Sequence, residues 1–188
     1  MPRKTPDALR GQARTLVTAA EAAARWFRRP DPAALSAART ARLRVRGWRE
    51  AALVALKSER GSVKIDAADF AFALREAVEH LVEALSDAVQ WGVGAEPVFA
   101  AMTESLRESA RALERAAGAD GPARAEALVQ AKRWAADVER RRRAALADAR
   151  ESPFFIESVK RSELARRLSS VAENLQQACD ALAGSLAE

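Results

Sequence analysis

The sequence predicts an all-α protein: six long helices in an up-and-down bundle, built from two similar three-helix halves. Ala, Leu, Arg and Glu dominate its 188 residues, and these are strong helix formers. Glycine occurs only eight times and proline seven times, so few positions interrupt a helix. Apolar residues also recur every three or four positions through long stretches, the period of one helix face. In the stretch Ile65–Val93 this face is predicted to consist of Phe70, Leu74, Ala77, Leu81, Ala84 and Ala88.

The first half of the chain contains three of the predicted helices. The first begins at Thr5-Pro6 and ends near Phe27, since threonine can cap a helix and proline is tolerated in its first turn. The second runs from Asp31-Pro32 to about Glu59 and stops at Gly61. The third begins after a predicted cap at Asp66 and ends around Gly92 and Gly94.

The same order repeats in the second half. Helices are predicted at about 95–117, 123–150 and 156–187, separated by a turn at 118–122 and by a break at Ser152-Pro153. These connections are too short for flexible interdomain linkers, so we expect a single domain spanning residues 1–188.

A weak internal repeat relates residues 1–94 to residues 95–188. Aligning Leu74 with Leu168 also pairs Glu79 with Glu173. The repeat predicts a pseudo-twofold bundle in which these two glutamates occupy equivalent places.

Composition favours a cytoplasmic protein. Cys179 is the single cysteine, which excludes an internal disulfide and fits a reducing compartment. The basic N-terminal stretch lacks the apolar segment of a secretory signal. No apolar run approaches the roughly 18–20 residues of a membrane span, so we expect no membrane insertion.

Charge is unevenly distributed along the chain. Residues 1–60 carry fourteen Lys/Arg and five Asp/Glu, whereas residues 61–100 carry two and seven. The opposite signs predict that oppositely charged helices pack against each other, as much as they indicate a surface for nucleic acid.

The third predicted helix bears an acidic stripe. Glu76, Glu79, Glu83 and Asp87 share one helical period, and carboxylates four residues apart repel unless a cation lies between them. The stripe is therefore a solvated face, an ion-paired face or a metal site. Glu79 and Glu83 project from one face, as a metal site requires, but His80 is the only histidine. One histidine excludes a ferritin-like di-iron centre, which needs two.

Arginines form a matching stripe on the second predicted helix. They are spaced so that they share one face, and packing beside the acidic helix would pair them with its carboxylates. We therefore predict a charge-paired seam whose members are Arg39, Arg42, Arg46 and Arg49 with Glu76, Glu79 and Glu83.

Other residue patterns favour neither catalysis nor nucleic-acid binding. The run Arg140–Arg143 offers contacts to phosphates, but arginines in an unbroken run point all round a helix, and no aromatic platform accompanies them. The sequence has no glycine-rich phosphate loop and no nucleophile elbow, so we expect a non-enzyme. Cys179 and the four tryptophans (Trp26, Trp48, Trp91 and Trp134) are interpreted as core or core-edge residues.

The chain resembles the PhoU-like proteins, and in particular the stand-alone PhoU-related group associated with inorganic phosphate transporters. The resemblance lies in Asp69-Phe70, Leu74 and Glu79-x-x-x-Glu83 of the third helix. It extends to Lys160–Leu164, Leu168 and Glu173 of the last helix, and to the helix lengths and the repeat.

The resemblance implies two three-helix bundles whose acidic motifs bind metal-ion clusters, and a role in regulating phosphate uptake. The metal candidates that it implies are Glu79, Glu83, Glu173 and Asp137. The chain departs from the family pattern where that pattern expects acidic pairs. It has Arg42 and Arg46 on the second helix, Arg133 beside Asp137 on the fifth, and Ser169 and Gln177 around Glu173. Arginines in place of carboxylates remove ligands and repel a metal.

The functional expectation is a PhoU-like cytoplasmic regulator or adaptor associated with inorganic phosphate transport. It would act through helical contacts with a transporter or a signalling protein. It would require no cofactor, although the four metal candidates could also bind an ion. The sequence leaves open whether the protein forms a homodimer. The alternatives are a structural or interaction bundle with no phosphate role and, less favoured, a basic nucleic-acid-binding bundle.

Overall fold

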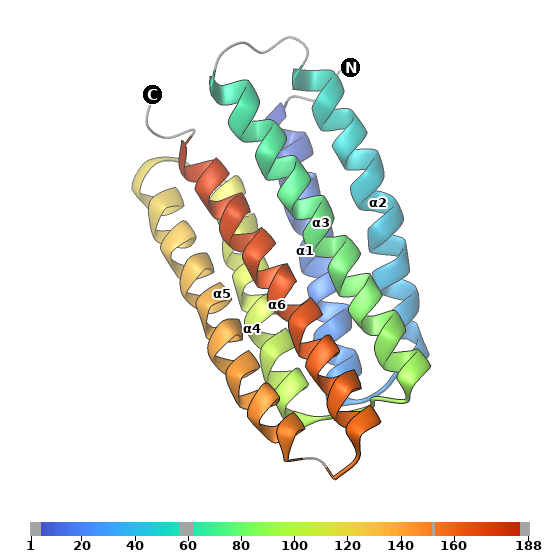
Figure 1. The fold of residues 1–188 in the computed structure, drawn as a ribbon. Helices are drawn as coiled ribbons and strands as arrows, with labels where there is room; N and C mark the ends of the chain where they lie inside the picture. The colour runs from blue at the N-terminus through green and yellow to red at the C-terminus, as the bar shows by residue number, and fades with distance from the viewer. Residues whose placement is uncertain (1–4, 57–61, 152, 185–188) are drawn as a thin grey trace.

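The computed structural model describes residues 5–56, 62–151 and 153–184. All the regular structure in these ranges is helical, and it forms a single bundle (Figure 1). The helices are α1 (Thr5–Arg28), α2 (Pro32–Leu56), α3 (Ser62–Trp91), α4 (Pro97–Ala117), α5 (Gly121–Arg150) and α6 (Phe155–Gly184). The predicted all-α fold with six long helices is confirmed.

Local capping signals set several helix ends as predicted. The Asp31 carboxylate accepts a hydrogen bond from the Ala33 amide (2.9 Å) at the start of α2. At the end of α3, Gly92 has a φ of +71°, and the Val93 amide donates to the Ala88 carbonyl (2.8 Å). This is a Schellman-type end, which requires a residue in the left-handed region and so favours glycine.

The start of α3 differs from the prediction. The helix begins at Ser62 rather than after Asp66, so Asp66 lies inside the helix and does not cap it. No glycine or proline separates Ser62 from Asp66, and nothing there interrupts the helical backbone. Glu59, Gly61 and Ala187, used to place the ends of the second and sixth helices, lie outside the described residues.

Successive helices run in opposite directions, so the α1–α2, α3–α4 and α5–α6 connections lie at one end of the bundle, the lower end in Figure 1. In each half the first helix contacts the second and third, and the second contacts the third. The halves meet through α1 against α4 and α3 against α6. Helices α2 and α5 therefore flank a central group of four.

One contiguous core runs through both halves. Every member of the predicted inner face of α3 is buried: Phe70, Leu74, Ala77, Leu81, Ala84 and Ala88. The rings of Phe27 and Phe99 lie 5.6 Å apart between α1 and α4. Much of the remaining core is alanine, whose small side chain lets helix backbones approach closely.

One polar side chain is enclosed in the core. Gln12 of α1 is fully buried, and its amide oxygen and nitrogen have no hydrogen-bond partner in the described part of the chain. Such a group lowers the stability of the fold, since it loses its hydrogen bonds to water and gains none.

Within the described ranges, no helix is both long enough and apolar enough to cross a membrane.

Candidate functional site

Glu79, at the centre of the acidic stripe, is held by two arginines of α2. Arg46 donates from Nε (3.1 Å) and Nη2 (3.0 Å) to Oε1, while Arg42 contacts Oε2. The Glu79 side chain is only 12% exposed, and both of its oxygens have guanidinium partners. These arginines neutralise a partly buried carboxylate where a cation would otherwise be required.

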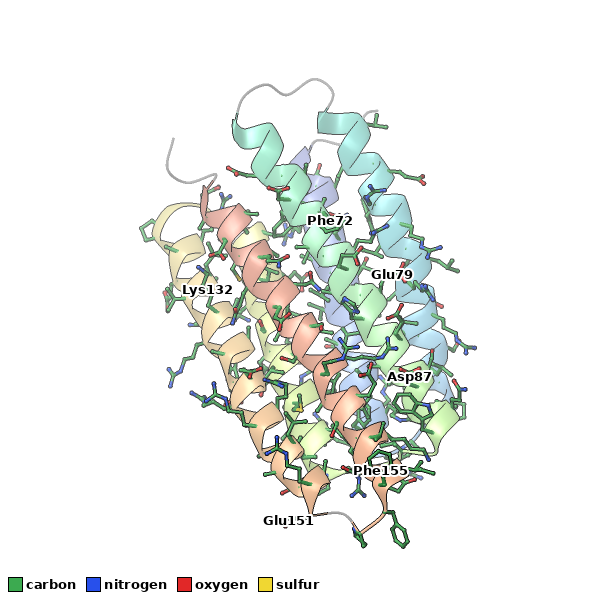
Figure 2. The ribbon with its side chains drawn as sticks, in the orientation of Figure 1. Phe72, Glu79, Asp87, Lys132, Glu151 and Phe155 are labelled. Carbon is green, nitrogen blue, oxygen red and sulfur yellow. The ribbon has the colours of Figure 1, made fainter. Side chains whose placement is uncertain are left out.

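The other predicted members of the seam do not join this group. Glu76 pairs with Arg75 of its own helix, and Glu83 pairs with Arg167 of α6 (2.7 Å). Neither Arg39 nor Arg49 forms an ion pair with any residue that the structure describes. Side chains four residues apart on a helix are offset by about 40° around its axis. Helix α3 contacts both α2 and α6, so Glu79 faces α2 (Figure 2), whereas Glu83 faces α6, where it meets Arg167.

A second ionic group, the Arg167 cluster, joins α3 to α6. Arg167 contacts Glu83 (2.7 Å), Asp87 (2.7 Å) and Glu163 of its own helix (3.4 Å). The Nδ1 atom of His80 lies 3.7 Å from Glu83. One guanidinium thus holds three carboxylates together. Sequence reasoning overlooked Arg167, and the only local signal was its position four residues after Glu163.

Asp137 of α5 faces α4 rather than α3. Its carboxylate accepts hydrogen bonds from Ser105 of α4 (2.7 Å), Arg140 (2.7 Å) and Arg141 (2.6 Å). Burial opposes ionisation of Asp137, but these three donors outweigh it and lower the pKa to about 2. Asp137 is a charged, fully partnered group that ties α5 to α4.

Glu139 and Glu173 lie toward the contact between α5 and α6. Glu139 accepts hydrogen bonds from Arg142 and from Ser169 of α6 (2.8 Å), and the Arg142 bonds are the main reason that its pKa is lowered. Hydrogen bonds to Glu139 are the main reason that the pKa of Arg142 is raised, and the charge of Glu173 adds to this. Glu173 itself is exposed and forms no ion pair within the described ranges. The residues paired by the repeat therefore differ, because Glu79 is mostly buried and Glu173 is not.

The four metal candidates do not form one centre. Glu79 faces α2, Glu83 faces α6, Asp137 faces α4, and Glu173 is exposed to solvent. Over the ranges that the structure describes, no group of three or more His, Cys, Asp or Glu residues is arranged to hold a metal ion. Arginines contact three of the four candidates, and a cation would have to displace them.

The remaining sequence candidates are structural or exposed. Cys179 is buried, and burial raises the pKa of its thiol to about 12, so it is protonated at neutral pH. Trp26 is buried, while Trp48 and Trp91 are half-buried. Trp134 of α5 was predicted at the core or its edge, but it is 39% exposed.

The Arg140–Arg143 run is divided between two helix contacts. Arg140 and Arg141 bind Asp137 toward α4, whereas Arg142 and Arg143 lie against Glu139 toward α6. The four guanidiniums do not share one groove in which a nucleic-acid backbone would lie.

An exposed apolar group lies at the start of α6, at the lower end of the bundle (Figure 2). We call Phe154, Phe155, Ile156 and Val159 the apolar tip. Their side chains are 68%, 81%, 67% and 50% exposed. A hollow of about 270 Å³ lies beside the tip, lined by Trp91 of α3 and by Phe155, Ile156, Val159, Lys160 and Glu163. Sequence reasoning treated this segment only as a helix start, although three consecutive large apolar residues at a turn were a usable signal.

No protein-family model matches the sequence, and no curated protein matches it.

Proposed function

We propose that the protein is a PhoU-like cytoplasmic regulator or adaptor of inorganic phosphate transport that acts through protein–protein contacts at the apolar tip. The phosphate role rests on the sequence resemblance. The all-helical bundle, in which like helices of two halves meet, is compatible with it.

The apolar tip is the observation that carries the interaction role. Exposed large apolar side chains that adjoin one another mark surfaces that other molecules cover. Aromatic residues beside a hollow are also typical anchors of a protein interface. Phe155 and Ile156 line the hollow together with Trp91, so a partner can bury an apolar side chain between α3 and α6. The partner in this proposal is a transporter or a signalling protein that offers an apolar segment.

No cofactor takes part in the proposed contact. The carboxylates that the family resemblance assigns to metal are held by arginines of the same chain, at Glu79 by Arg42 and Arg46 and at Glu83 by Arg167. These pairs would keep the bundle assembled without an added cation.

Phosphate uptake in the source organism tests the proposal. Deleting the gene should change the rate of phosphate uptake, and the wild-type chain should restore it. The variant F155D/I156D should fail to restore uptake, because it places charges on the apolar tip. The matched control L43D/V129D changes two exposed apolar residues on α2 and α5 and should restore it.

Two results would count against the proposal, each in a different way. Unchanged uptake after deletion would remove the phosphate role and favour an interaction bundle with another partner. Full restoration by F155D/I156D would remove the apolar tip as the contact surface, while leaving the phosphate role in place.

A further inference from the structure

A hollow between α1 and α4 is lined mainly by arginines. It measures about 280 Å³, and its walls come from the last turns of α1 and the middle of α4. The lining residues are Glu21, Ala24, Arg25, Arg28, Arg29, Arg107 and Arg111. We call this hollow the arginine cleft. It involves neither α3 nor α6 and is therefore separate from the apolar tip.

Carboxylates neutralise only part of the arginine cleft. Arg111 donates to Glu21 (2.8 Å) and to Glu108 (3.2 Å). Arg107 contacts Glu108 and Glu104, and Arg28 also contacts Glu104. Five arginines therefore face three glutamates, which leaves an excess of two positive charges.

The excess charge is carried by Arg25 and Arg29. Both side chains are exposed, and neither forms an ion pair with a residue in the described ranges. The three glutamates at the hollow, Glu21, Glu104 and Glu108, are instead held by Arg28, Arg107 and Arg111. Two exposed guanidiniums that line a cationic hollow leave their hydrogen-bond donors available to an outside anion.

The end of α1 does not by itself explain this arrangement. Arginines in a last turn stabilise the negative end of a helix, and Arg25 and Arg28 are placed to do so. Arg107 and Arg111 lie in the interior of α4, where no such effect operates. Their presence beside the α1 arginines concentrates donors that match the oxygens of phosphate groups.

We propose that the arginine cleft binds an anion with two or more linked or clustered phosphate groups, held chiefly by Arg25 and Arg29 and framed by Arg28, Arg107 and Arg111. The hollow has room for more than one phosphate group. Phosphate oxygens of this kind occur in soluble phosphate anhydrides and in clustered headgroups of anionic lipids. The two sources share one chemistry, and separate arms of one experiment distinguish them.

The first arm titrates the full-length protein with pyrophosphate by calorimetry in about 150 mM NaCl, where long-range attraction is screened. The second arm measures sedimentation with vesicles of phosphatidylcholine containing one-fifth phosphatidic acid. Binding in either arm should weaken at least about tenfold in R25Q/R29Q, which removes two bidentate donors. The arm that shows the binding identifies the source of the phosphate groups.

The control variant R39Q/R133Q loses the same charge at exposed arginines outside the cleft, and it should bind as the wild type does. Both variants change exposed side chains, and helical circular dichroism with a melting curve checks that each is folded. No binding in either arm up to about 1 mM ligand would overturn the proposal. Equal weakening in the two variants would overturn it as well, since only net charge would then matter. Neither of these binding results would test the proposed function, because the apolar tip is tested by F155D/I156D in the phosphate-uptake assay.

Discussion

Replacing Gly11 by alanine tests whether Trp48 packs directly on the backbone of α1. An added Cβ at Gly11 would lie 2.6, 2.7 and 2.8 Å from three atoms of the Trp48 indole. Ordinary contacts of this kind are 3.4–4 Å. The indole would have to move by roughly 1 Å, and it packs against a small cluster that includes Ala8, Ala52 and Ala71.

Gly47 of α2 supplies the matched control. It also lies inside a helix, but a Cβ added there would have nothing within 4 Å, so alanine at this position meets open space. Glycine inside a helix costs about 0.8–1.0 kcal/mol relative to alanine. G47A should therefore raise the free energy of unfolding by about that amount.

G11A gains the same helix propensity but also overpacks the α1–α2 contact, which costs about 1–3 kcal/mol. Its free energy of unfolding should therefore lie about 1–3 kcal/mol below that of G47A. Urea unfolding followed by helical circular dichroism measures both values. Removing the indole with W48A should restore the benefit of alanine at position 11, as a double-mutant cycle would show. Equal stabilisation by G11A and G47A in the wild-type background would refute the packing described here.

Three further predictions concern polar groups that are buried or partly buried. Q12M should raise the free energy of unfolding by about 1–3 kcal/mol in urea titrations, since it removes two buried amide atoms that lack partners; a loss would show that the amide is satisfied. The pKa of Asp137 is about 2 in the folded protein against an ordinary value of 3.8, so its contribution of about 2 kcal/mol is present above pH 4 and lost as the pH falls toward 2. D137N should lack this part of the pH dependence, and an unchanged stability–pH profile would contradict the assignment. R167M should lower the free energy of unfolding by about 2–4 kcal/mol, because three carboxylates lose their shared cation. R167K keeps a cation and should lower it by less. The exposed control R133M should change it by less than about 0.5 kcal/mol.

Short-range signals predicted the elements of this fold well. The apolar period of α3 identified its buried face from Phe70 to Ala88, and the Asp31 and Gly92 signals located one helix start and one helix end. Asp66 misled the prediction because a capping residue type is also tolerated inside a helix when nothing interrupts the backbone.

The site depended on contacts that no local pattern contains. Matching periods predicted that arginines of the second helix face the acidic helix, and Arg42 and Arg46 do contact Glu79. The spacing of the acidic residues did not show that Glu83 would pair with Arg167, a residue 84 positions away. That pairing depends on which helix lies on each side of α3.

The sequence by itself determined the helical class, the number of helices and the residues that form their inner faces, because each depends on neighbours within one or two turns. The tertiary structure alone decided which charges meet, that Gln12 is enclosed without partners in the described part of the chain, and that five arginines of α1, its C-terminal end and α4 share one hollow. Those features depend on the order and rotation of helices around a common core. That order is set by the packing of the whole bundle, which no single helix encodes.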